Sequence, residues 1–140
     1  SHTDGVSGNL LLHIYAGVVA MRPACIVMDE PTAMLDPQGR KAVMEIARRL
    51  NDEGITVILI THFMDEAARA DRVIVMDDGK IILDGTPAQV FAHTDEIKQA
   101  GLALPSVTDL IDRLRKRGID VPSDIISGED FIAWVSTQNI

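Results

Sequence analysis

Two short apolar segments, separated by a helical pattern, most constrain the fold of this chain. Residues 24–29 (ACIVMD) and 55–60 (ITVILI) run almost uninterrupted through apolar residues, and the second is rich in β-branched side chains. Between them, residues 38–53 carry apolar positions at helical spacing, and Gly54 follows as a C-terminal stop. Strand, long helix and strand form a βαβ unit. This predicts a parallel sheet whose strands are covered on both faces.

Three further elements complete the expected α/β part, which we place at residues 1–85. The apolar run at 10–21 predicts a helix that follows an opening loop, and 64–70 predicts a short helix. The turn sequence at 77–79 (Asp-Asp-Gly) is typical of a β-hairpin. Its two strands are expected at 73–76 and 80–83.

A second domain is expected at residues 86–140, where short helical patterns alternate with Gly and Pro. Ser106 and Ser127 are expected to be N-caps, the latter with Asp130 three residues on. We interpret this part as a small helical appendage packed on the α/β part. Its helices are expected at 87–100, 106–117 and 128–136.

Composition excludes several classes of function. The net charge of −8, from 13 basic and 21 acidic residues, argues against a nucleic-acid surface. No segment reaches the roughly 18 to 20 apolar residues that span a bilayer. The single cysteine, Cys25, allows no internal disulfide, and its apolar surroundings predict a buried, inert thiol.

The first apolar segment ends in two adjacent acids, Asp29 and Glu30. A buried, unpaired carboxylate costs several kcal/mol, so acids at the tip of a core strand need a partner or a task. An apolar strand that ends in Asp-Glu resembles the second nucleotide-site motif of P-loop ATPases, often called Walker B. In that motif the aspartate holds Mg²⁺ and the following acid polarises the attacking water molecule. Many strands, however, simply end in solvated acids, and the pair alone leaves both interpretations open.

The sequence around these acids resembles the ATP-binding cassette (ABC) ATPases. Asp29-Glu30-Pro31-Thr32 continues to Leu35-Asp36-Pro37, and Thr61-His62 stands at the tip of the next predicted strand. The resemblance implies that Asp29 binds magnesium and that Glu30 is the catalytic carboxylate. It likewise places Asp36 in the D-loop beside the nucleotide, and makes His62 the switch histidine that contacts the γ-phosphate.

Two longer segments narrow this resemblance to one subgroup of the ABC ATPases. They are AMRPACIVMDEPTAMLDPQGR and NDEGITVILITHFMDEAARADRVIVMDDGKIILDGTP. They are similar to the ATPase subunits of energy-coupling factor transporters, the cobalt and vitamin importers, in which a methionine such as Met34 is typical. The resemblance implies a partial P-loop NTPase-type sheet and a subunit that hydrolyses MgATP. Its partners would be a second ATPase subunit and a transmembrane coupling subunit, at the cytoplasmic face of the cell membrane.

Several family features are absent from these 140 residues. There is no GxxxxGK[ST] phosphate loop and no glutamine loop, and only Ser7-Gly8 stands where the family's nucleotide-binding signature should fall. We therefore expect the chain to represent the C-terminal part of such a subunit and to be inactive by itself. By the same resemblance, residues 86–140 would correspond to the family's C-terminal helical extension, which has a dimerising or regulatory role. The alternative is a non-catalytic fragment that binds no nucleotide and self-associates through this appendage. Apolar faces left bare would also favour association.

Overall fold

A computed structural model describes residues 4–125 and 127–138, and the side chains of residues 4–11 lie outside the description. The chain divides into two compact units, Ser1–Thr61 and His62–Ile140. The boundary predicted after residue 85, between an ATPase core and an appendage, stays a prediction. None of the described helices is long and apolar enough to cross a membrane.

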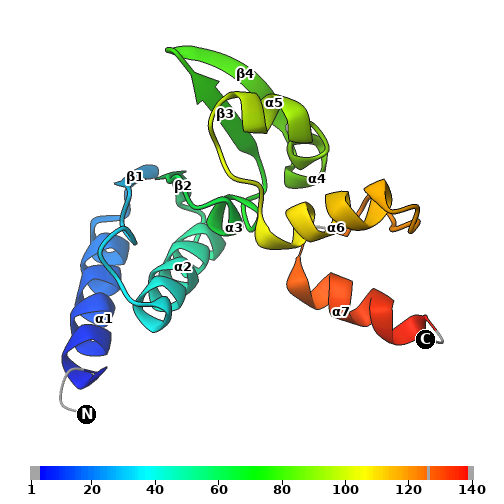
Figure 1. Ribbon diagram of the computed structural model, residues 1–140. Coiled ribbons are helices and arrows are strands. Elements are labelled where there is room, and N and C mark those ends of the chain that lie inside the picture. Colours follow the sequence, from blue (N-terminus) through cyan, green and yellow to red (C-terminus); the bar gives the residue numbers. More distant parts are fainter. Residues whose placement is uncertain (1–3, 126, 139–140) are drawn as a thin grey trace. The chain divides into compact units, whose positions relative to one another are not determined.

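The first unit contains a small parallel sheet, as the βαβ pattern predicts. Strands β1 (Cys25–Asp29) and β2 (Thr56–Ile60) pair in parallel, and helix α2 (Pro37–Asp52) connects them. Helix α1 (Asp4–Met21) contacts α2, which in turn contacts β2 (Figure 1). Helix α1 begins at Asp4, so the opening loop expected before residue 10 is largely helical.

Helix α2 forms for local reasons that the sequence shows. Asp36 is its N-cap and Pro37 its first residue, where a missing N–H costs nothing. The chain leaves the helix through Gly54, whose φ of +88° suits glycine. Its apolar stripe is buried in the first unit at Val43, Ala47 and Leu50.

The expectation that β1 and β2 are covered on both faces is wrong for this structure. Side chains along both strands alternate between exposed and half-buried. Val27 is 59% exposed and Ile58 is 47% exposed, whereas Ile26 and Val57 face the covered side. Successive side chains of a strand point to opposite faces, so the helices of this unit cover only one of them. The expectation of a buried Cys25 is wrong for the same reason, since this residue lies on the open face.

The second unit is organised by a hairpin whose turn the sequence predicts. Strands β3 (Val73–Asp77) and β4 (Lys80–Gly85) are antiparallel, and Asp78 and Gly79 both have positive φ, at 47° and 71°. Helices α4 (Pro87–Phe91) and α5 (Thr94–Gln99) lie beside the hairpin (Figure 1). They replace the single helix expected at 87–100. One hydrophobic core joins these elements to α3 (Met64–Ala67), and it contains Met64, Val73, Val75, Val90, Phe91, Ile97 and Leu104.

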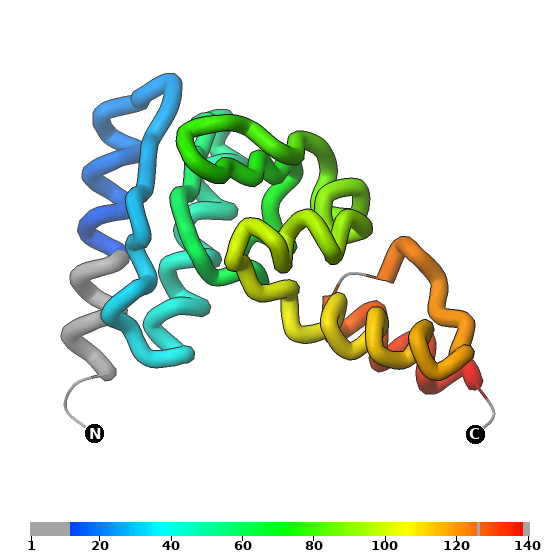
Figure 2. The backbone as a smooth tube through the Cα atoms, turned by 45° about the horizontal axis from the view of Figure 1, so that its top comes forward, coloured from blue at the N-terminus to red at the C-terminus, as the bar shows by residue number. Residues whose placement is uncertain are grey.

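The last two helices build a second core. Helices α6 (Ser106–Lys116) and α7 (Gly128–Thr137), drawn in yellow to red in Figure 2, both contribute side chains to a core around the buried residues Ile111, Val121 and Ile125. Trp134 and Phe131 of α7 pack against this core. Ser127 caps α7 by accepting a hydrogen bond from Asp130 N at 3.1 Å, which confirms that prediction.

Ser106, in contrast, is not the N-cap of α6. Pro105 occupies the cap position and offers no side-chain hydrogen bond, while Ser106 is the first residue of the helix. Proline has no polar side chain, so the free N–H groups of this helix end need another acceptor. That acceptor is Asp65, which lies 41 residues earlier in the chain.

Candidate functional site

The two acids predicted for the site lie together at the carboxyl end of β1. Asp29 pairs in register with Ile60, the last residue of β2. Glu30 extends this pairing by one residue, because its N–H donates to the Ile60 carbonyl at 2.8 Å. Both acids are exposed. The carboxyl edge of the parallel sheet therefore presents two neighbouring carboxylates to solvent, at the edge where open α/β sheets bind ligands.

Glu30 has an unusual backbone conformation. Its φ is +45°, in the left-handed region that non-glycine residues rarely adopt. Immediately afterwards the chain turns, and Ala33 N donates to the Glu30 carbonyl at 3.2 Å. Residues held in such conformations cluster at functional sites, where the surrounding structure fixes them. The outlier falls on the residue that the sequence predicts to be catalytic.

The segment after Glu30 is fixed at both ends of its turn. Thr32 is buried, with 1% exposure, and its carbonyl accepts from Leu35 N at 3.1 Å. Asp36 accepts a hydrogen bond from Gly39 N at 2.7 Å, as N-cap of α2. A Cβ at Gly39 would come within 3.0 Å of the Asp36 Oδ1 atom, so this close approach favours glycine. The loop between Thr32 and Asp36 carries Met34, which is 95% exposed.

His62 is the first residue of the second unit and is exposed. Its ring stacks on that of Phe63, with centroids 4.2 Å apart and planes tilted by 34°. Phe63 is the N-cap of α3, and its carbonyl accepts from Glu66 N at 3.0 Å and Ala67 N at 3.3 Å. The one-turn helix α3 thus holds the backbone that carries the imidazole. Chain connectivity places His62 two residues after the end of β2.

Comparison with known proteins shows which proteins the chain resembles in sequence. No family model matches the chain. Energy-coupling factor transporter ATP-binding protein EcfA1 of Caldanaerobacter subterraneus subsp. tengcongensis is 59% identical over 121 residues, which are 86% of this chain and 44% of that protein. EcfA1 of Clostridium perfringens is 51% identical over 118 residues, 84% of this chain and 42% of that protein. The chain is a partial homologue of the energy-coupling factor ATP-binding proteins.

A solved structure of an ABC transporter protein also matches the chain. CbiO1 from Clostridium perfringens, described as part of the ABC transporter complex cbiONQ, matches with a TM-score of 0.52 and 40% sequence identity. The match covers 69% of this chain and 39% of that one. The chain thus spans less than half the length of the energy-coupling factor relatives it matches.

For a homologue of ATP-binding proteins, the fit of magnesium can be judged from the donor set. Magnesium in nucleotide sites is usually held by one or two carboxylates, together with water and substrate phosphates. Asp29, exposed at a strand end, fits this pattern. No group of three or more His, Cys, Asp or Glu side chains suited to a metal occurs in the described part of this homologue. The described residues therefore do not form a metal site made of protein ligands alone.

Two features of the site escape prediction from this homologue's sequence. The burial of Thr32 depends on the geometry of the turn that follows Glu30. The hydrogen bonds between Asp65 and Ser106 join residues that are 41 positions apart. A motif-level signal exists only for Thr32, which follows Glu30-Pro31 directly. Ser7 and Gly8, the predicted signature remnant, fall within α1, in the stretch 4–11 whose side chains lie outside the description.

Proposed function

We propose that the chain is the C-terminal part of an ABC ATPase subunit that energises an energy-coupling factor importer. Its sheet would be part of a P-loop NTPase-type sheet, and residues 86–140 would be its helical appendage. The observation that carries the proposal is the Asp29-Glu30 pair at the carboxyl end of a parallel strand. It occurs in a chain that is 59% identical over 121 residues to an energy-coupling factor ATP-binding protein.

In the proposed site, each of the predicted residues has a distinct task. Glu30 would orient and polarise the attacking water, and the fixed turn around it would hold its carboxylate in place. His62 would donate a hydrogen bond to the terminal phosphate of ATP. Asp29 would hold Mg²⁺, which neutralises charge on the phosphate oxygens when it is bound. Asp36, as part of the D-loop, would lie close to the nucleotide.

A phosphate loop has to come from outside the 140 residues, since their sequence contains no GxxxxGK[ST]. The remainder of such a subunit would supply it. A second ATPase subunit and a transmembrane coupling subunit would complete the importer at the cytoplasmic face of the membrane. The cargo would be cobalt or a vitamin, by resemblance to the family. Ser7 and Gly8 would contribute what remains of the nucleotide-binding signature.

The proposal can be tested by supplying the missing part in trans. The chain is co-expressed with the portion of the Caldanaerobacter relative that the 121-residue match does not cover, and MgATP hydrolysis by the purified pair is measured. We expect hydrolysis that requires both pieces. In the pair, Glu30→Gln should lower kcat roughly 100-fold or more while ATP binding persists, because it removes the general base and keeps the shape of the side chain.

Glu45→Gln serves as the matched control, because Glu45 is an exposed glutamate on α2, away from the end of β1. This control should leave kcat unchanged. Unaltered turnover in Glu30→Gln would refute the catalytic assignment, whatever the control shows. Calorimetry of the 140-residue chain alone should detect no MgATP binding. Micromolar binding by the isolated chain would show that its own residues form a phosphate site.

The open face of the parallel sheet favours a second candidate function, that of a non-catalytic, self-associating fragment. Val27, Ile58 and Ile60 are each between 47% and 59% exposed on this face. Exposed apolar surface of this kind favours association with another chain. Failure of every trans-supplied partner to restore hydrolysis, together with concentration-dependent self-association, would favour this candidate.

A further inference from the structure

The carboxylate of Asp65 joins two segments that lie far apart in the sequence. Its Oδ1 accepts a hydrogen bond from Ser106 N at 3.0 Å, and its Oδ2 accepts from Ser106 Oγ at 3.0 Å. Both oxygens are thus bound to the first residue of α6. A carboxylate at this position neutralises free N–H groups and interacts favourably with the positive end of the helix. We call this pair of hydrogen bonds the Asp65–Ser106 clamp.

Both sides of the clamp are anchored in the same hydrophobic core. Met64, which precedes Asp65, is a core residue of the second unit, and so is Leu104, two residues before Ser106. Pro105 is fully buried as well. The clamp therefore links two segments whose neighbouring residues are already packed in the core. A displacement of one segment would move the other through these hydrogen bonds.

On its other side, the clamp acts on the backbone of His62. Asp65 is the second residue of α3, which has four residues. A helix of this length is not stable alone and depends on tertiary contacts. Its buried contacts come from Met64 and Glu66, and its polar link to α6 comes from Asp65. Phe63, the N-cap of α3, follows His62 directly, so the backbone of His62 adjoins the start of this single turn.

We propose that Asp65 is a positioning residue, which ties the orientation of the His62 imidazole to the start of α6. The inference rests on the proposed function in one respect, since His62 matters for activity only if it contacts nucleotide. A shift of the helical appendage that pulls on Ser106 would then be felt at His62. Both partners of the clamp are exposed, so either can be substituted without removing a residue of the hydrophobic core.

The test observes His62 directly in the 140-residue chain, without nucleotide. Imidazole carbon–proton correlations are recorded by NMR, and the His62 signal is assigned through a His62→Gln variant. Asp65→Ala removes both hydrogen bonds, and Ser106→Ala removes only the hydroxyl. We expect both variants to displace or broaden the His62 signal, the first more than the second. Ser106→Thr keeps the hydroxyl and should restore the original position.

Two controls separate positioning from a general loss of structure. Ser127→Ala removes the equivalent hydroxyl from the N-cap of α7, and should leave the His62 signal in place. His93, which pairs with Glu96 at 3.0 Å on α5, is an internal reference whose signal should not move in the clamp variants. Trp134 fluorescence reports whether each variant keeps the second core.

An unmoved His62 signal in Asp65→Ala and in Ser106→Ala would overturn the proposal and leave the clamp as a helix cap only. Equal displacement by Ser127→Ala would overturn it too. Neither result depends on hydrolysis, so failure of the Glu30→Gln experiment and failure of this one are distinguishable.

Discussion

At the scale of single residues, Glu30 combines a predicted catalytic carboxylate with a strained backbone. Its φ of +45° is a conformation that costs a non-glycine residue roughly 1 to 2 kcal/mol. We therefore predict that the free energy of unfolding of Glu30→Gly exceeds that of Glu30→Ala by about 1 kcal/mol, as measured by urea unfolding. Both variants lack the carboxylate, so the comparison isolates the backbone. Equal stability of the two would show that the turn is not strained.

Asp36 has a structural task that can be separated from its predicted place beside the nucleotide. Because its carboxylate accepts from Gly39 N at 2.7 Å, Asp36→Ala should lower the free energy of unfolding by about 1 kcal/mol. Asp36→Asn keeps an oxygen acceptor at the cap and should be nearly neutral, as measured by urea unfolding followed by circular dichroism. If Asp36→Asn is as destabilised as Asp36→Ala, charge rather than capping holds the loop.

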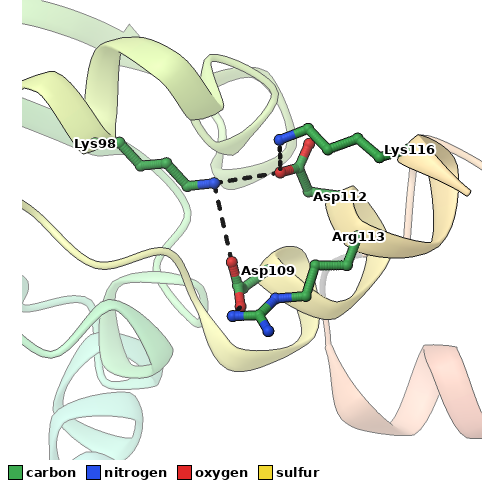
Figure 3. Close-up of polar contacts among 5 residues, drawn as sticks. All are labelled: Lys98, Asp109, Asp112, Arg113 and Lys116. Atoms are coloured by element: carbon green, nitrogen blue, oxygen red, sulfur yellow. Dashed lines mark hydrogen bonds and ion pairs between the residues drawn. The ribbon is translucent and has the colours of Figure 1, made fainter.

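At the scale of elements, helices α5 and α6 are joined by an ion-pair network (Figure 3). Lys98 on α5 lies 3.2 Å from Asp112 and 4.0 Å from Asp109, both on α6. Lys116 lies 2.7 Å from Asp112, and Arg113 lies 2.7 Å from Asp109. Two of the three basic residues in the last turn of α6, Arg113 and Lys116, thus make ion pairs. The third, Arg115, donates to the Val121 and Pro122 carbonyls.

This network makes stability depend on pH in a defined direction. The hydrogen bond from Lys116, with a smaller contribution from Lys98, holds the pKa of Asp112 below its ordinary value of 3.8, against the opposing effect of burial. A carboxyl group whose pKa is lowered on folding stabilises the protein above its unfolded pKa. That contribution is lost as the pH falls through the folded pKa. The stability advantage over Asp112→Asn should therefore be complete at pH 7. It should start to shrink as the pH approaches the ordinary pKa of 3.8, and be lost once the pH has fallen below the lowered pKa of the folded state.

Urea unfolding of both proteins, followed by Trp134 fluorescence across this pH range, measures the difference. Asp120→Asn is the control, because Asp120 is an exposed aspartate shortly after α6. Its difference from the unaltered chain gives the baseline for replacing an exposed aspartate. A difference for Asp112→Asn that does not shrink relative to this baseline as the pH is lowered from 7 to well below 3.8 would contradict the assignment of this carboxylate.

Elements that depend on local sequence were predictable, whereas contacts between distant segments were not. The hairpin turn at Asp78-Gly79 and the cap of α7 at Ser127 follow from residues within four positions, and the structure shows both. Ser106 looked like an equally good cap, but its partner, Asp65, lies 41 residues away. Exposure of Cys25 could not be foreseen either, because the faces of a strand depend on which elements pack against it.

The candidate site divides in the same way. The order of Asp29, Glu30 and Asp36 along the chain is a sequence property. The placement of Asp29 and Glu30 at the end of β1, and of Asp36 at the start of α2, follows from it. The left-handed backbone at Glu30 is not visible in the residue itself, since glutamate has no preference for positive φ. It arises from the hydrogen bonds to Ile60 and Ala33, which hold the turn from both sides.

At the scale of the whole molecule, the two units differ in how their apolar residues are used. Two hydrophobic cores are buried in the second unit. In the first unit, one face of the β1–β2 sheet is open, with Val27 59% exposed. Exposed apolar surface favours association, so we predict that the chain self-associates through this face.

Two isosteric substitutions on neighbouring strands test this prediction. Val27→Thr adds a hydroxyl to the open face, and Val57→Thr adds the same hydroxyl to the covered face, where Val57 is half-buried. In sedimentation velocity runs over a range of concentrations, Val27→Thr should shift association to higher concentration. Its stability should stay within about 0.5 kcal/mol of the unaltered chain. Val57→Thr should instead lower the free energy of unfolding by about 1 kcal/mol, because its hydroxyl is placed among apolar groups. A sedimentation coefficient of the unaltered chain that does not depend on concentration would contradict the prediction, and the open face would then be tolerated by a monomer.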